Sequence, residues 1–250
     1  VRSMPATARS DCAIVIPARF ASSRFPGKPL ADLLGKPMIR HVWERCVAAL
    51  GQQHVYVATD DARIRAACEG FGARVLMTSS SCLTGTDRVA EAARALDYDF
   101  LVNVQGDEPM LDPADILAVA AAWRRHGGAG VNAMTAIADE REYRSRNVPK
   151  VVATQDGRLM YMSRAAIPAN KGGSFEKAWK QVCIYCFSPA QLAAFASVSA
   201  KGPIEQIEDI EILRFLDLGF EVRMVELASA SIAVDTPEDL ERVVHALRGR

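Results

Sequence analysis

The stretch that decides the fold runs from Ile14 to Leu30 and reads I-V-I-P-A-R-F-A-S-S-R-F-P-G-K-P-L. Its first three residues are β-branched and apolar, which predicts a buried strand that ends at Pro17. The loop after this strand holds three cations, two hydroxyls and a glycine, namely Arg19, Ser22, Ser23, Arg24, Gly27 and Lys28. Aimed donors of this kind are what a polyphosphate requires, so we predict a phosphate site here. A solvated basic loop remains the alternative, because the spacing does not match a Walker A motif.

The first half of the chain alternates between short apolar runs and segments with helical spacing. After the first strand and a helix that ends near Gly51, apolar runs recur at 55–58, 75–77 and 100–104, and each is followed by a helical pattern. This alternation predicts a doubly wound, mainly parallel α/β sheet. Ligands of such sheets bind at the carboxyl ends of the strands, where the basic loop also lies.

Two aspartates follow apolar runs at positions where a metal could bind. Asp107 lies in the segment Gln105-Gly106-Asp107-Glu108-Pro109, directly after the run that ends at Val104, and Asp235 precedes the last helix. Carboxylates opposite a phosphate loop suit Mg²⁺, which takes carboxylate and phosphate oxygens. The alternatives are that Asp107 is an ordinary turn residue and that Asp235 only caps the final helix.

The second half changes character. A strand is predicted at 131–137, a β-hairpin at 150–162, and a further strand at 182–187. Ile204 to Leu216 is predicted to be one helix, with Ile207, Ile210, Ile212 and Leu213 facing inward and Glu205, Glu208, Asp209 and Glu211 on the charged face. A solvated face is the simpler interpretation of these acids, although Glu205 or Glu208 could face a ligand.

Composition excludes several classes of function. The 250 residues include 30 basic and 30 acidic side chains, so the balance of charge does not favour nucleic acid or an anionic membrane as a partner. No apolar run approaches the ~20 residues of a membrane span. The six cysteines form no disulfide framework, and Cys183-Ile-Tyr-Cys186 lies in a predicted strand, which favours reduced thiols and a cytoplasmic protein. We expect a flexible tail at 1–11 and a single domain at 12–250.

Five motifs carry a resemblance over nearly the whole chain after the tail. They are I-P-A-R-x-x-S-S-R-F-P-G-K-P-L at 16–30, T-G-T-D-R at 84–88, V-N-V-Q-G-D-E-P at 102–109, Y-M-S-R-A-A-I-P at 161–168 and V-D-T-P-E-D-L-E-R-V at 234–243. Together they resemble the 3-deoxy-manno-octulosonate cytidylyltransferases. The resemblance implies a Rossmann-like three-layer α/β fold with a mostly parallel mixed sheet, and a homodimer built partly through a smaller lobe at about 131–200. It also implies an Mg²⁺-dependent reaction of CTP with an acidic sugar that releases pyrophosphate.

The resemblance also implies roles for individual residues. Arg19 and Lys28 would clamp the triphosphate, with Ser23 and Arg24 in the same loop, and Asp107 and Asp235 would bind the metal. Next to the cytidine and the sugar acid we expect Thr84, Gly85, Thr86, Arg88, Gln105 and Arg164, and around the sugar pocket Gln181, Glu205 and Glu208.

One departure from the family pattern concerns the acceptor. The family has an R-H-x-G-I-Y-x-Y segment beside the sugar, and here Lys180 to Phe187 occupies it with Gln181 in place of the histidine. Glutamine cannot supply the charge that histidine can. A different acidic sugar or another acceptor therefore stays open, as does a catalytically silent nucleotide-binding paralogue.

Overall fold

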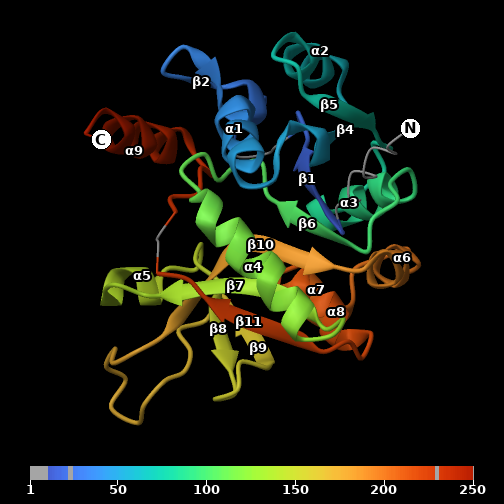
Figure 1. The fold of residues 1–250 in the computed structure, drawn as a ribbon. Coiled ribbons are helices and arrows are strands. Elements are labelled where there is room, and N and C mark those ends of the chain that lie inside the picture. The colour runs from blue at the N-terminus through green and yellow to red at the C-terminus, as the bar shows by residue number, and fades with distance from the viewer. Residues whose placement is uncertain (1–10, 22–24, 229–230, 250) are drawn as a thin grey trace, which may run out of the picture.

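A nine-stranded mixed sheet forms the centre of the computed structural model, which describes residues 11–21, 25–228 and 231–249 (Figure 1). Its strand order is β11-β7-β10-β6-β1-β4-β5, and the hairpin β8–β9 is attached through β10. β1, β4, β5 and β6 are parallel, and β11 is parallel to β7, whereas β10 is antiparallel to its three partners β6, β7 and β8. The strands of this sheet are β1 (Cys12–Ala18), β4 (Val55–Thr59), β5 (Arg74–Met77), β6 (Phe100–Val104), β7 (Gly130–Ala136), β8 (Lys150–Ala153), β9 (Leu159–Ser163), β10 (Trp179–Phe187) and β11 (Val222–Glu226).

Both faces of the sheet are covered, which explains why its central strands are apolar throughout. All seven residues of β1 are buried. Ile14 and Ile16 point to one apolar cluster, and Ala13 and Val15 point to the other. Burial on both faces is typical of parallel strands and gives a continuous apolar run rather than an alternating one.

The helices form the two outer layers. α1 (Met38–Leu50), α2 (Ala62–Gly70) and α4 (Pro113–Arg125) place their apolar faces on one side of the sheet, and α3 (Gly85–Ala93), α6 (Pro189–Ala196) and α8 (Ile212–Asp217) lie on the other. α5 (Glu140–Arg144) and α7 (Pro203–Glu208) are short. Among the described residues, no helix combines the length and hydropathy that a membrane span requires. The predicted three-layer α/β fold is confirmed.

The C-terminal helix α9 (Pro237–Arg248) packs beside the start of α1 (Figure 1). Val234 and Val243 share a separate apolar cluster with Leu33, Met38 and Met110. Leu33 belongs to a small two-stranded sheet, β2 (Asp32–Leu33) with β3 (Lys36–Pro37). This cluster brings the segment around residue 235 back to the carboxyl end of the central strands.

The predicted smaller lobe is continuous with the main sheet. β7 pairs with β10 and β11, and β10 also pairs with β6. Within the described residues, the hairpin β8–β9 and the loop between β9 and β10 extend beyond these strands (Figure 1). The hairpin itself is as predicted.

Asp11, which we expected to belong to a flexible tail, is hydrogen-bonded to the start of β6: its carbonyl accepts from the N–H groups of Asp99 and Phe100. Residues 1–10 of that tail lie outside the described residues.

The prediction of one helix over 204–216 is wrong. The segment forms α7 and α8, separated at Asp209, which adopts the left-handed conformation with a φ of 51°. The break rotates α7, so Ile207 is 83% exposed instead of facing inward, while Glu205 is fully buried instead of solvated. Arg164 stabilises the break because its guanidinium donates to the carbonyls of Glu208 and Asp209, which therefore do not need helical partners.

Candidate active site

Lys28, Asp107 and Asp235 meet at the carboxyl end of the central strands. Lys28 Nζ lies 2.8 Å from Asp107 Oδ2 and 3.5 Å from Asp235 Oδ1, and it also donates to the carbonyl of Val234. The side chains of Lys28, Asp107 and Asp235 are 14%, 26% and 35% exposed, so a ligand can reach all three. The predicted meeting of the basic loop with two aspartates distant in sequence is present.

Glycines and backbone hydrogen bonds fix this geometry. Gly27 takes the left-handed conformation that glycine adopts without strain, and the chain turns there into the 3₁₀ turn that begins at Lys28. A Cβ on Gly106 would lie 3.0 Å from the carbonyl oxygen of Pro17, so glycine lets the exit of β6 approach that of β1. Val234 N–H donates to the carbonyl of Asp107, which ties the two aspartate-bearing segments together.

Asp107 lies in the turn that follows β6, as its alternative interpretation had it, but other residues cap the helices that follow the two aspartates. Asp112 caps α4 through the N–H of Ala114, and Thr236 caps α9 through a capping box with Asp239. The carboxylates of Asp107 and Asp235 are instead directed at Lys28.

The electrostatics keep Lys28 charged. Burial disfavours its ammonium form, but the carboxylates of Asp107 and Asp235 outweigh this effect and raise the pKa of Lys28. The neighbouring Glu108 is buried, and burial together with the charge of Asp107 raises the pKa of Glu108 to about 7.

Two carboxylates that converge on one cation are a suitable donor set for Mg²⁺. This ion is usually held by one or two carboxylates together with substrate phosphates and water. In the described part of the chain, no group of three or more His, Cys, Asp or Glu side chains could hold a metal by itself. Asp107 and Asp235 match the number of carboxylates with which a protein usually holds this ion.

A second group of predicted residues lies at the start of α3. Thr84 is the N-cap, and the Gln105 amide packs on Gly85 so closely that a Cβ there would lie 2.8 Å from it. Thr86 is buried, and its N–H and hydroxyl both donate to Glu211, at 2.9 and 2.5 Å.

Glu211 also belongs to this group. From the sequence it was predicted only to lie on the charged face of a helix. Its carboxylate also accepts from Gly85 N–H, so it satisfies two donors at the start of α3. Burial raises the pKa of Glu211, and the hydrogen bonds from Thr86 and Gly85, which lower it, only partly offset this effect. The signal was weak because Glu211 lies among four acids in seven residues, and the sequence does not show that α7 and α8 are separate helices.

Arg88 lies on the same helix turn, and its backbone N–H donates to the carbonyl of Thr84, but its side chain is engaged elsewhere. Its buried guanidinium donates to Thr78 Oγ1 at 2.5 Å and pairs with Asp60 at 3.2 Å. Both partners follow the ends of β4 and β5, so Arg88 links α3 to these strands.

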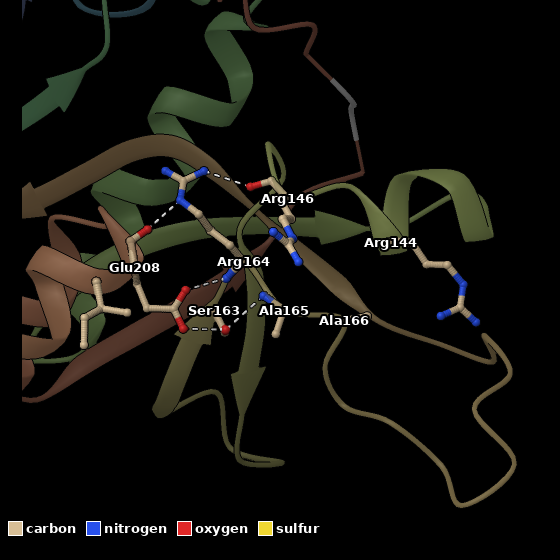
Figure 2. A pocket seen from close by; sticks show the side chains of 8 residues that line it. Arg144, Arg146, Ser163, Arg164, Ala165, Ala166 and Glu208 are labelled. Atoms are coloured by element: carbon tan, nitrogen blue, oxygen red, sulfur yellow. Dashed lines mark hydrogen bonds between the residues drawn. The ribbon is translucent and has the colours of Figure 1, made fainter.

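A third group surrounds a cavity of about 430 Å³ next to the hairpin β8–β9 (Figure 2). Glu208 lines it and accepts from Ser163 Oγ at 2.6 Å and from Arg164 N–H at 2.8 Å. Burial works against ionisation, but these donors lower the pKa of Glu208. The Arg164 guanidinium donates to three backbone carbonyls, those of Arg146, Glu208 and Asp209.

Gln181 lies on β10 near this group. Its amide donates to Asn132 Oδ1 at 3.0 Å, and its backbone N–H donates to the carbonyl of Pro149.

Glu205 has a structural environment rather than the predicted sugar-facing one. Its two carboxylate oxygens accept from Arg214 at 2.6 and 2.7 Å, and the pair is buried. Arg214 also donates to Asp87 at 2.9 Å, which links α8 to α3.

The remaining predicted residues belong to the basic loop. Arg19 is exposed just after β1, and within the described ranges no hydrogen bond or ion pair joins it to Lys28 or the aspartates. Ser23 and Arg24 lie outside the described residues.

Comparisons with known proteins agree with this geometry. A family model described as "Cytidylyltransferase" matches residues 13–222. The 3-deoxy-manno-octulosonate cytidylyltransferase of Myxococcus xanthus (strain DK1622) is 42% identical over 238 residues, which cover 94% of this chain and 96% of the relative. An 8-amino-3,8-dideoxy-manno-octulosonate cytidylyltransferase of Shewanella oneidensis is 41% identical and covers 92% of this chain and 95% of its own.

A solved structure agrees as well. The structure of a CMP:2-keto-3-deoxy-manno-octonic acid synthetase complexed with CTP has a TM-score of 0.88 and 36% identity, and the match covers 96% of this chain and 99% of that one. The chain therefore belongs to the cytidylyltransferase family and is similar over almost its whole length to its 3-deoxy-manno-octulosonate members.

Proposed function

We propose that the protein transfers the cytidylyl group of CTP to 3-deoxy-manno-octulosonate, which gives the CMP-sugar and pyrophosphate. The observation that carries this proposal is the meeting of Lys28 with Asp107 and Asp235 at the carboxyl end of the sheet. The relatives named for this reaction, and the CTP complex of a similar protein, support the choice of nucleotide and acceptor.

In the proposed reaction an acceptor hydroxyl attacks the α-phosphorus of CTP and pyrophosphate leaves. Catalysis of such a transfer depends mainly on alignment and on neutralising the charge of the phosphate oxygens. Lys28 remains protonated and donates to these oxygens. Arg19, which directly follows β1, would add a second positive charge. We place the nucleoside at the start of α3, and the sugar acid at Gln105 and at the cavity that Arg164 and Glu208 line.

Mg²⁺ held by Asp107, Asp235 and the triphosphate would supply further neutralisation of the phosphate charge. Metal dependence is part of this proposal, and the donor set of two convergent carboxylates supports it. Without the metal, the two carboxylates would face the triphosphate as like charges, so we expect chelation to abolish turnover.

The identity of the acceptor sugar is a separate part of the proposal. Gln181 is uncharged and donates to Asn132, and relatives at nearly equal identity are named for the 8-hydroxy and the 8-amino sugar. We propose the 8-hydroxy sugar first, because the solved relative with the high TM-score is named for it.

We further propose that the enzyme is a cytoplasmic homodimer. None of the six cysteines, all of which lie in the described residues, forms a disulfide, which is compatible with a reducing compartment. Met160 on β9 and Ile204 and Ile207 on α7 are large apolar side chains that remain exposed on neighbouring parts of the fold, and a second copy could cover them.

The test is pyrophosphate release from CTP, UTP and ATP with 3-deoxy-manno-octulosonate, its 8-amino analogue and an aldose phosphate, each with Mg²⁺ and with EDTA. We expect release with CTP, Mg²⁺ and the 8-hydroxy acid, and none with EDTA. Binding of CTP without release for any acceptor would instead support a catalytically silent nucleotide-binding protein.

A further inference from the structure

Lys150 is a fully buried cation that contacts Arg164, a residue that lines the cavity of Figure 2. Its Nζ donates to three backbone carbonyls: Ser145 at 2.7 Å, Val148 at 2.6 Å and Arg164 at 2.8 Å. An ammonium group has three donors and no acceptor, so each of its N–H bonds has one partner. Lys150 therefore joins the loop 145–148 to the end of β9 at one point.

The environment of Lys150 is unfavourable for a charged side chain, because the ammonium group is buried. Among the described residues Lys150 forms no ion pair, and burial together with the nearby charge of Arg164 lowers its pKa, although the carboxylate of Glu208 acts in the opposite sense. A buried charge with no ion-pair partner destabilises the folded state unless hydrogen bonds compensate. The three carbonyls supply that compensation, and they also define what the lysine holds in place.

The segment that Lys150 holds supports three residues predicted to surround the sugar. The carbonyl of Arg146 accepts from the Arg164 guanidinium at 3.0 Å, and the carbonyl of Pro149 accepts from Gln181 N–H at 3.0 Å. Arg164 in turn donates to the carbonyl of Glu208 at 2.5 Å. Loss of the Lys150 contacts would therefore loosen the loop 145–148 and the end of β9, and with them the Arg164 guanidinium.

We infer that Lys150 is a positioning residue for the acceptor: it holds the loop 145–148 and Arg164 so that the cavity keeps the shape that receives the sugar acid. The inference rests on the proposed function for the identity of the acceptor. It assigns Lys150 no contact with either substrate, so its effect should fall on the acceptor and not on CTP, whose predicted site lies beside Lys28 and the start of α3.

The test compares Lys150→Met with Lys36→Met, which removes an exposed lysine paired with Glu44 on α1. For Lys150→Met we expect the KM for the sugar acid to rise about 10- to 100-fold, as for a group misplaced by about an ångström, while the KM for CTP stays within about twofold. Lys36→Met should change neither. Equal rises in both KM values, or no rise for the acid, would overturn the inference.

A double-mutant cycle separates positioning from general destabilisation. If Lys150 acts through Arg164, the losses of kcat/KM in Lys150→Met and Arg164→Gln should be strongly non-additive, because the second change removes what the first has already misplaced. Additive losses would contradict the inference.

Two hydrogen-exchange measurements make the result independent of folding and of activity. In Lys150→Met, amide exchange should accelerate at 145–149 and 164–166 and remain unchanged in α1. In the wild type, the sugar acid with CTP should protect 145–149, and this measurement applies even if the variant does not fold. Absence of pyrophosphate release by the wild type would refute the proposed function, whereas unchanged exchange in folded Lys150→Met would refute the role of Lys150.

Discussion

Glu205→Gln should destabilise the protein far more than the same chemical change in an exposed pair of the same geometry. Glu205 is 0% exposed and Arg214 is 2% exposed, and the carboxylate accepts two hydrogen bonds from the guanidinium. Glutamine keeps the shape but removes the charge and turns one acceptor into a donor that faces the guanidinium. Breaking a buried ion pair by changing one partner costs about 3–5 kcal/mol. We expect about 3 kcal/mol, because Asp87 still accepts from Arg214 at 2.9 Å.

The matched control is Asp11→Asn. Asp11 also accepts two hydrogen bonds from one guanidinium, that of Arg124, at 2.5 and 2.6 Å, but the two side chains are 38% and 45% exposed. An exposed pair contributes about 0–1 kcal/mol, since water screens and replaces it. The comparison therefore isolates burial from hydrogen-bond geometry.

The assay is urea-induced unfolding followed by circular dichroism, with the free energy of unfolding extrapolated to zero urea. If the free energy of unfolding falls with urea concentration at a similar slope in the wild type and both variants, their denatured states are comparable. A loss below about 1 kcal/mol for Glu205→Gln, or equal losses for both variants, would refute the assignment of the buried pair as the link between α7, α8 and α3.

Three further predictions follow from the site. The pKa of Glu108 is raised from 4.5 to about 7 in the folded state, so between these pH values the folded protein binds one proton more than the unfolded protein. The free energy of unfolding of the ligand-free protein should therefore fall by up to about 3 kcal/mol as the pH rises from 5 to 8. Glu108→Gln should flatten this dependence, and an unchanged pH profile would contradict the burial of Glu108. Gly85→Ala should displace the Gln105 amide and reduce kcat/KM about 10- to 100-fold, whereas Gly70→Ala, with no neighbouring atom within 4 Å of its Cβ, should leave kinetics unchanged. Lys28→Met should lower kcat about 100- to 1000-fold in a pyrophosphate-release assay, and a rate within tenfold of the wild type would exclude Lys28 from charge neutralisation.

Much of the fold could be predicted from the sequence because local patterns and strand connections determine it. The buried run at Ile14 and the alternation of strands with helices fix the parallel part of the sheet, and in such a sheet the loops at strand ends must share one edge. Lys28 and Asp107 could therefore be placed together before any coordinates were known. Asp235 joined them through the family motif, and the apolar cluster around Val234 explains its position.

The wrong predictions for residues 204–216 share one physical cause. The helical pattern at 204–216 is strong, yet Asp209 interrupts it because Arg164, 45 residues earlier, binds the carbonyls of residues 208 and 209. A tertiary contact of this kind has no local signature. It exposed Ile207, buried Glu205 and placed Glu211 at the start of α3, so the role of each of these residues depended on a break that periodicity could not reveal.

The most direct measurement is the turnover of Asp107→Asn with CTP, Mg²⁺ and 3-deoxy-manno-octulosonate, compared with the wild type at matched circular dichroism. If Asp107 and Asp235 hold the metal opposite Lys28, kcat should fall by about 100-fold or more while the fold remains intact. A folded Asp107→Asn protein that releases pyrophosphate at the wild-type rate would contradict the proposed site.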